Sequence, residues 1–245
     1  MRPAVPSDLP ALKALWSLSF PEDGDAARDA FFAAVGITHC FVEEKDGVVA
    51  SMTFGLPVSD GEREFQYIYA ACTHPDFRGR GVFSELLQQV LAQAKARGFA
   101  ASFLHPAEPS LVAFSARVGY TPAVFVSRGQ GEAKRPVSVE KLTAEDYAAR
   151  RERLAPAPYL RWPTALLALV SERYAVEDSV ALCERRGETL VVKEWLGGGD
   201  PSGLAAALGC TRYEWVRPAE DGEAYVLWLP FDEHCRLPYV GPVFD

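Results

Sequence analysis

The sequence predicts an α/β (α+β) protein in which a mixed central sheet is flanked by helices and a second, smaller α/β domain follows. Three observations lead to this prediction. Apolar residues alternate with period two in several short segments and recur with helical spacing in the segments between them. A polar, glycine-containing stretch at residues 128–136 predicts a linker. The length of 245 residues suits one large domain or two small ones.

Residues 1–127 are expected to form the first domain. Ser7 or Asp8 can cap a first helix, and a second short helix is expected at 25–34. Lys45-Asp46-Gly47 predicts a hairpin turn, because it separates two alternating segments and its glycine can adopt a positive φ. The expected strands of this part are 39–44, 48–56 and 65–73.

The clearest helix is predicted over residues 81–97. Its apolar residues recur at helical spacing and define one buried face. These residues are Phe83, Leu86, Leu87, Val90, Leu91 and Ala94. Gly98 ends the helix. A strand at 100–105, a helix at 110–117 and a strand at 122–127 complete the first domain.

Residues 137–245 are expected to form the smaller companion domain. Helices are predicted at 143–154, 163–174 and 201–208, and strands at 179–184, 189–195 and 223–229. This order loosely repeats that of the first domain, which predicts a degenerate second copy of the same unit. The aromatic residues of its strands could pack on the first domain or form the face of a homodimer.

Charge and composition exclude several function classes. The net charge of -8 argues against nucleic-acid binding, which depends on clustered lysine and arginine. No apolar run is long enough to span a membrane and no signal peptide is visible, so a cytoplasmic protein is expected. The five cysteines and four histidines have no metal-ligand spacing, so no metal and no disulfide framework is predicted.

One stretch carries the chemistry. A strand that ends at Thr73 is followed by Pro75, by Arg78-Gly79-Arg80-Gly81 and then by the strongest helix. Glycines let the backbone approach a ligand closely, and the first amides of a helix lack intrahelical partners. These amides point outward at the positive end of the helix dipole. The loop therefore predicts a cradle for an anion such as a pyrophosphate.

These residues resemble the pyrophosphate motif of the GNAT superfamily of acetyl-CoA-dependent N-acetyltransferases. That motif follows a strand ending in Val/Thr-x-Pro, here Thr73-His74-Pro75, and ends with a small residue where this chain has Phe83. A bulky residue at that point is similar to the enhanced-intracellular-survival branch of the superfamily. The order of elements over residues 1–127 resembles the GNAT order as well.

The resemblance implies an acyltransferase that moves an acetyl group from acetyl-CoA to a primary amine of a small-molecule or peptide acceptor. The amides of Arg78, Gly79, Arg80, Gly81, Val82 and Phe83 would hold the pyrophosphate. The backbone of Ala71, Cys72 and Thr73 would pair with the pantetheine arm, and an amide there would polarise the thioester carbonyl. Acids near residues 22–29 suggest that the acceptor is cationic.

The general acid departs from the family pattern. The family often has a tyrosine four residues before the glycine of the second helix, and that position is Ser115. A serine could act only through a water. Tyr69 and His105 are the preferred substitutes lining the acceptor site, and Tyr67 and Tyr120 are alternatives more typical of packing. The terminal carboxylate at Asp245 is a candidate base, because relatives in this branch use their chain end in that way.

A catalytically weak acyl-CoA-binding regulatory module is the alternative function. The serine at position 115 and the divergent second half favour it. Thiol release from acetyl-CoA across a panel of amines would distinguish the two functions.

Overall fold

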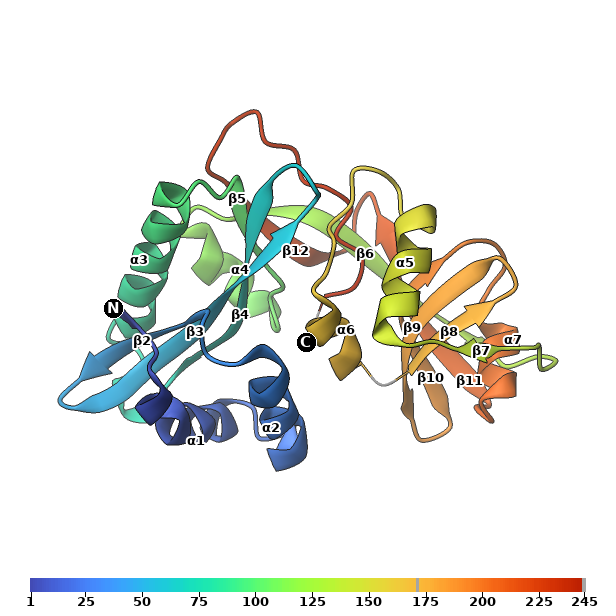
Figure 1. The fold of residues 1–245 in the computed structure, drawn as a ribbon, viewed down its shortest axis with the longest axis horizontal. Helices are drawn as coiled ribbons and strands as arrows, with labels where there is room; N and C mark the ends of the chain where they lie inside the picture. Colours follow the sequence, from blue (N-terminus) through green and yellow to red (C-terminus); the bar gives the residue numbers. More distant parts are fainter. Residues whose placement is uncertain (171, 244–245) are drawn as a thin grey trace. The chain divides into compact units, whose positions relative to one another are not determined.

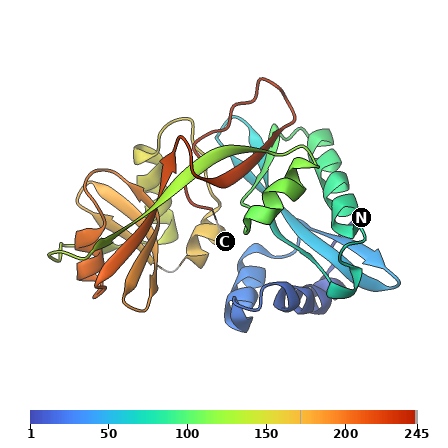
Figure 2. The ribbon, with the colours of Figure 1, turned by 180° about the vertical axis from the view of Figure 1, so that it is seen from behind.

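The computed structural model describes residues 1–170 and 172–243 and divides into two compact units. Unit 1 consists of Met1–Thr121 and Val226–Arg236. Unit 2 consists of Pro122–Tyr225 and the chain from Leu237 onward. In Figures 1 and 2, which are coloured along the sequence, unit 1 is the blue-to-green part together with the dark red stretch 226–236.

The strands of unit 1 are hydrogen-bonded in the order β1-β2-β3-β4-β5-β12. Their bounds are Arg2–Pro3, Cys40–Lys45, Val48–Ser59, Glu64–Thr73, Ala101–Leu104 and Glu223–Pro230. Neighbouring strands are antiparallel except β4 and β5, which are parallel. The strand that pairs with β5 on its other side comes from the C-terminal part of the chain.

Helices cover both faces of the unit 1 sheet. Figures 1 and 2 show α3 on one face and α1 with α2 on the other. The helices are α1 (Leu9–Ser19), α2 (Gly24–Val35), α3 (Val82–Ala96) and α4 (Pro109–Ala116), with 3-10 turns η1 (Pro6–Asp8) and η2 (Pro75–Phe77). Phe54, Phe65 and Phe103 are fully buried in the sheet between these layers.

The predicted elements of residues 7–127 are confirmed, with small shifts at their ends. The strongest prediction, the helix at 81–97, corresponds to α3. Its buried face contains Leu86, Leu87 and Val90 as predicted. The first apolar position differs, because Val82 is buried whereas Phe83 is only partly covered.

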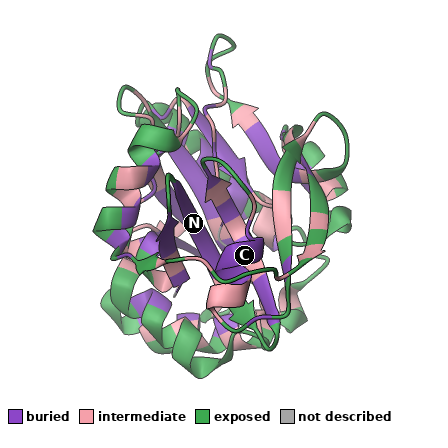
Figure 3. Ribbon diagram, turned by 90° about the vertical axis from the view of Figure 1, so that its right-hand side faces the viewer, coloured by how far each residue is buried: buried purple, intermediate pink, exposed green. Residues whose placement is uncertain are grey.

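The strands of unit 2 are hydrogen-bonded in the order β6-β11-β10-β9-β8-β7. Their bounds are Thr121–Glu132, Arg212–Ala219, Thr189–Leu196, Ser179–Arg186, Glu172–Val176 and Glu140–Lys141. The helices are α5 (Ala144–Leu154), α6 (Thr164–Leu169) and α7 (Ser202–Ala207). Figure 3 shows buried positions along the strands and exposed positions on the outer sides of the helices.

The two units share one topology. In unit 1, β2, β3 and β4 form an antiparallel meander, and β4 is parallel to β5 after the crossover through α3. In unit 2, β8, β9 and β10 form the same meander, and β10 is parallel to β11 after the crossover through α7. The last strand of unit 1, β12, comes from the C-terminal half of the chain, whereas the last strand of unit 2, β6, follows α4 of unit 1 along the chain. This repeat confirms the predicted second copy of the unit.

The predicted linker at 128–136 differs from the structure, in which residues 128–132 belong to β6. The glycines that suggested flexibility face aromatic rings on the paired strand. Gly129 pairs with Trp215, and Gly131 pairs with Tyr213. A Cβ at either glycine would overlap the facing ring, so these glycines allow aromatic side chains to lie across the strand.

The predicted helix at 163–174 is too long. α6 ends at Leu169, and β8 begins at Glu172. The guanidinium of Arg173 donates to the carbonyl oxygens of Leu167, at 3.0 Å, and Val170, which closes the helix end. The sequence also did not predict β7, β8 and β11.

Candidate functional site

A β-bulge in β4 lies at the centre of the candidate site. The pairing of β3 with β4 passes from Met52 opposite Cys72 to Phe54 opposite Tyr69. Two residues of β4, Ala70 and Ala71, therefore stand opposite one residue of β3. Ala70 has φ 48°, a left-handed conformation that is uncommon outside glycine. The bulge turns the backbone of Ala71 away from the regular ladder, and Ala71 is exposed.

The strands β4 and β5 separate beside this bulge. Their parallel pairing runs from Phe65 opposite Ala101 to Ile68 opposite Leu104. β4 continues to Thr73, whereas β5 ends at Leu104. The edge of β4 that faces β5 is therefore left without that partner strand beyond Ile68. We call this point the fork.

Tyr69 and His105 occupy the first position after the fork. Tyr69 lies in β4, and His105 directly follows the last residue of β5. Two residues earlier, the rings of Tyr67 and Phe103 stack at 5.0 Å. Side chains two residues apart share one face of a sheet. Tyr69 therefore continues this row on the α1–α2 face, where its ring lies 5.2 Å from that of Phe31. Along the chain, Tyr69 and His105 each lie one residue beyond the last β4–β5 pair, whereas Ser115 lies in α4.

The glycine loop after β4 leads directly into α3. Gly79 and Gly81 have φ values of 72° and 78°. A Cβ at either position would meet no atom within 4 Å, so the loop borders open space. The first α-helical hydrogen bond runs from the Glu85 N–H to the Gly81 carbonyl at 3.0 Å. The amides of the preceding turn are the orphan donors of the helix start.

Arg78 contacts the end of β4 rather than contributing its amide to the cradle. Its backbone N–H donates to the Pro75 carbonyl at 3.2 Å, and its guanidinium Nε donates to the Thr73 carbonyl at 2.9 Å. The Cys72 carbonyl accepts from the Ser51 hydroxyl at 2.8 Å. Among the predicted cofactor residues, Gly79 to Phe83 contribute the amides of the loop and of the first helical turn. By contrast, the carbonyls of Cys72 and Thr73 and the N–H of Arg78 already have hydrogen-bond partners within the protein.

Phe83 fits at the end of the motif because its ring packs sideways on α4. The rings of Phe83 and Phe114 lie 5.8 Å apart. The guanidinium of Arg117 lies 5.7 Å from the centre of the Phe114 ring. These contacts accommodate the bulky side chain of Phe83 at the start of α3.

Ser115, the third predicted catalytic residue, is buried in α4 with 3% of its surface exposed. Its carbonyl accepts from the N–H groups of Val118 at 3.0 Å and Tyr120 at 3.2 Å, which end the helix. The Tyr120 hydroxyl is buried and lies 2.7 Å from the Ser102 hydroxyl. Burial raises the pKa of Tyr120 well above its ordinary value. Tyr120 is therefore a packing residue, in agreement with the interpretation of the sequence.

Two of the four acids at residues 22–29, Asp25 and Asp29, lie in ion pairs. Asp25 and Asp29 lie 2.7 Å and 2.9 Å from Arg28, and Asp29 also lies 3.1 Å from Lys13. The carboxylate of Asp23 accepts from the Trp16 indole at 2.8 Å. These contacts reduce the negative potential that the sequence suggested for a cationic acceptor.

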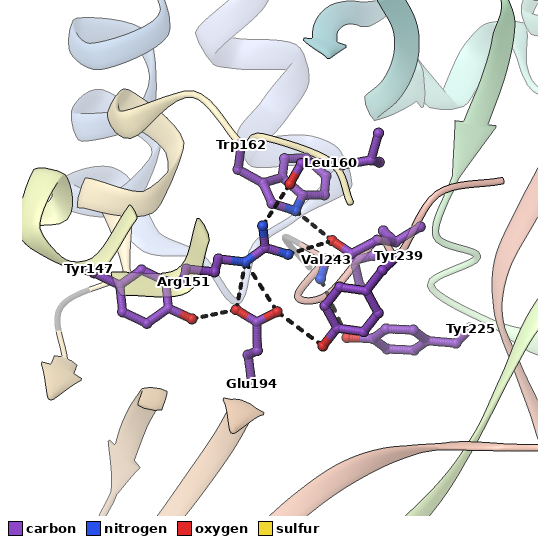
Figure 4. A network of polar contacts seen from close by, with 9 residues as sticks. Tyr147, Arg151, Leu160, Trp162, Glu194, Tyr225, Tyr239 and Val243 are labelled. Atoms are coloured by element: carbon purple, nitrogen blue, oxygen red, sulfur yellow. Dashed lines mark hydrogen bonds and ion pairs between the residues drawn. The ribbon is translucent and has the colours of Figure 1, made fainter. Parts of the chain in front are cut away.

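The tail of the chain is anchored within unit 2 by a buried polar cluster, shown in Figure 4. Arg151 Nε lies 2.9 Å from a Glu194 oxygen, and Glu194 also accepts from the hydroxyls of Tyr147 and Tyr239. The Val240 carbonyl accepts from the Trp162 indole at 2.8 Å and from the Arg151 guanidinium at 3.3 Å. The predicted candidate base at Asp245 lies outside the described residues.

The counterpart of the cradle in unit 2 holds an anion of the protein itself. β10 has a bulge at Lys193, and its pairing with β11 ends at Val192, as β4 and β5 do near their bulge. The following loop is rich in glycine, but the Asp200 carboxylate accepts the Ser202 N–H at 2.8 Å and lies 3.5 Å from the Lys134 ammonium. A carboxylate at the start of α7 would repel an anionic ligand.

The sequence did not predict the bulge itself. The small pair Ala70-Ala71, inside a strand rich in aromatic residues, is the signal that could have located it. Among residues 1–170 and 172–243, no group of three or more His, Cys, Asp or Glu side chains could hold a metal ion. No helix in these ranges is long and apolar enough to cross a membrane.

Comparisons with known proteins find acetyltransferases among both the family models and the solved structures. A family model described as an acetyltransferase (GNAT) domain matches residues 1–123. A GCN5-related N-acetyltransferase from Anabaena variabilis is 15% identical with a TM-score of 0.72, and the match covers 94% of this chain and 72% of that one. One from Kribbella flavida is 18% identical with a TM-score of 0.68, covering 94% and 71%. Eis1 from Mycobacterium abscessus is 14% identical with a TM-score of 0.67, covering 92% and 72%.

At these identities the solved structures show a common fold. A comparison with curated proteins found no match. The family model spans half of the chain and includes α1 to α4, the bulge, the fork and the glycine loop. This chain therefore belongs to the GNAT family of acetyltransferases.

Proposed function

We propose that the protein is an N-acetyltransferase that moves an acetyl group from acetyl-CoA to a primary amine of a small-molecule or peptide acceptor. The observation that carries this proposal is the fork of β4 and β5 beside a bulge, followed within one loop by an open cradle of amides. A bound thioester needs an edge to align its arm, a donor for its carbonyl and a cradle for its phosphates. These three features follow one another along residues 68–83.

The chain's own residues fit the phosphates of acetyl-CoA. Gly79 and Gly81 leave open space on the side where a Cβ would lie. The amides from Gly79 to Phe83 would donate to the pyrophosphate at the positive end of α3. Arg80 is exposed and adds positive charge at this loop. Arg78 would act mainly by tying the loop to the end of β4.

The bulge would orient and polarise the thioester. The amide of Ala71 is our candidate donor to the thioester carbonyl oxygen, where negative charge develops during attack. The backbone of Ala71, Cys72 and Thr73 would align the pantetheine arm along the edge that β5 leaves uncovered. The amine must lose a proton to attack, and the departing thiolate must gain one.

Tyr69 and His105 are our candidates for proton transfer at the fork. Both lie one residue beyond the last pair of β4 and β5, so both border the place where the thioester would lie. Ser115 is buried and could act only through a water. The terminal carboxylate at Asp245 stays a proposed base.

Release of CoA thiol from acetyl-CoA across a panel of primary amines tests this proposal. Tyr69→Phe removes only the hydroxyl, and His105→Gln keeps a polar side chain that cannot exchange a proton near neutral pH. Loss of kcat with unchanged acetyl-CoA binding is therefore expected for the residue that carries the proton. Such a loss is typically 10²–10⁴-fold for a general acid or base. Thiol release at the same rate with and without each amine of the panel would contradict the proposal.

The burial of Ser115 keeps one alternative open. A regulatory module that binds acyl-CoA without turnover needs the cradle but no acid. Tight acetyl-CoA binding without amine-dependent release of CoA would favour that function. We further propose a cytoplasmic protein, supported by five buried free cysteines. A cationic acceptor and a homodimer through unit 2 stay predictions.

A further inference from the structure

The α1–α2 side of the fork carries aromatic side chains. The Tyr69 ring lies 6.1 Å from that of Trp16 and 5.8 Å from that of Tyr67. The Trp16 ring in turn lies 5.4 Å from that of Phe20 at the end of α1. Trp16 is buried, whereas Phe20 and Tyr69 are both partly exposed. We call Phe20, Trp16 and Tyr69 the aromatic wall.

The aromatic wall is held in place from behind. The Trp16 indole N–H donates to the Asp23 carboxylate at 2.8 Å, which fixes the ring plane. Phe31 packs against both Trp16, at 4.9 Å, and Tyr69, at 5.2 Å. Fixed rings lose little conformational entropy when a ligand binds against them. The wall is therefore preorganised for a flat apolar partner.

The charges around this wall suit an ammonium group. Asp25 and Asp29 are paired with Arg28, and Lys13 is a second partner of Asp29. Asp23, which accepts from the Trp16 indole, and the exposed Glu22 add two further carboxylates. Acids therefore outnumber bases here and attract an ammonium group, while the aromatic rings suit the apolar body of the ligand.

We propose that the acceptor is a monoamine whose primary amino group is joined to an aromatic ring by a short chain, and that the aromatic wall binds this ring. The inference rests on the proposed function. Tyr69 adjoins the bulge, where the thioester carbonyl would lie. A ligand ring that packs against Tyr69 therefore keeps the amino group of the ligand, a short chain away, close to that carbonyl. Offset or edge-to-face contacts with the exposed parts of Phe20 and Tyr69 would orient the ligand.

Three amines test the proposal at saturating acetyl-CoA, with release of CoA thiol as the readout. They are 2-phenylethylamine, n-butylamine and spermidine. Two aromatic contacts and ring burial predict that kcat/KM for 2-phenylethylamine exceeds that for each of the others at least about tenfold. Equal or better turnover of n-butylamine or spermidine would overturn the proposal and leave the acetyltransferase function standing.

Phe20→Leu should lower the ratio of kcat/KM for 2-phenylethylamine over n-butylamine at least about fivefold, mainly through KM. Phe231→Leu is the matched control, because Phe231 is also a partly exposed phenylalanine of unit 1. It lies away from the fork, since its N–H donates to the Ala100 carbonyl at the opposite end of β5. This control should keep the wild-type ratio. An unchanged ratio in Phe20→Leu would refute a role for the wall.

Calorimetry on acetyl-CoA-loaded protein separates the two proposals. If no amine releases CoA but 2-phenylethylamine binds at least about tenfold more tightly than n-butylamine, the aromatic wall is supported and the acetyltransferase function fails. If neither turnover nor binding distinguishes the amines, the inference is overturned.

Discussion

Glu194→Gln should destabilise unit 2 strongly, because it removes one charge from a buried ion pair. Arg151 and Glu194 have side chains that are 3% and 1% exposed, and their atoms approach to 2.9 Å. Glutamine keeps the shape but only one acceptor oxygen, so it can accept from only one of the Tyr147 and Tyr239 hydroxyls, which donate to different oxygens of Glu194. It leaves the guanidinium of Arg151 buried without a counter-charge, although the carbonyls of Leu160 and Val240 still accept from it. Breaking a buried pair in this way costs about 3–5 kcal/mol.

Glu140→Gln supplies the matched control, because its partner Arg150 is the neighbour of Arg151 on α5. Its partner Arg150 lies at 2.6 Å, but the two side chains are 62% and 33% exposed. An exposed pair contributes at most about 1 kcal/mol. Urea unfolding followed by tryptophan fluorescence should therefore show a large loss of unfolding free energy for Glu194→Gln and a small one for Glu140→Gln. Losses that agree within about 1 kcal/mol would refute the idea that burial of this pair decides its energetics.

Three further predictions concern packing and titration. Gly129→Ala should lower the free energy of unfolding in urea by about 1–3 kcal/mol, because its Cβ would overlap the facing indole. Gly198→Ala has open space around its Cβ and should lower it by less than about 1 kcal/mol. Similar losses of unfolding free energy in the two variants would contradict this prediction. The hydrogen bond from Arg2 lowers the pKa of Asp8, so the stability that Asp8 adds is present above its unfolded pKa of about 3.9 and is lost as the pH falls below it. The excess stability of the wild type over Asp8→Asn should accordingly shrink between pH 5 and about pH 2, and a constant difference in acid denaturation would disprove it. Burial raises the pKa of Cys72 to about 12. At pH 8, alkylation of Cys72 by iodoacetamide should therefore be at least about a hundredfold slower in the folded than in the unfolded protein, as measured by mass spectrometry of the Cys72 peptide. Equal alkylation rates would show that this thiol is accessible.

The first unit could be predicted from the sequence because its signals are local. Helical spacing from Phe83 to Ala94, the Asp46-Gly47 turn and the glycine loop each act over a few residues. The fork could be inferred only through the family resemblance, because it depends on where β4 and β5 stop pairing. The bulge at Ala70 and the partners of Arg78 depend on contacts that no local pattern reports.

The second unit was harder to predict because tertiary contacts override its local signals. Gly129 and Gly131 indicated a flexible linker, but rings on a strand more than 80 residues away cover them. The helix predicted beyond Leu169 ends where Arg173 caps it. The burial of Arg151 against Glu194 depends on β10, and a charged residue on a helix ordinarily indicates solvent.

Calorimetric titration of acetyl-CoA into the wild type, Gly81→Val and Gly47→Val tests the central claim most directly. Gly81 and Gly47 have similar positive φ values of 78° and 75°, and a Cβ at either would meet open space, so the two variants carry comparable backbone strain. Only Gly81→Val fills the cradle. We predict that the wild type and Gly47→Val bind acetyl-CoA alike and that Gly81→Val binds at least about tenfold more weakly. Absence of binding to the wild type, or equal binding by all three proteins, would contradict the assignment of the cradle.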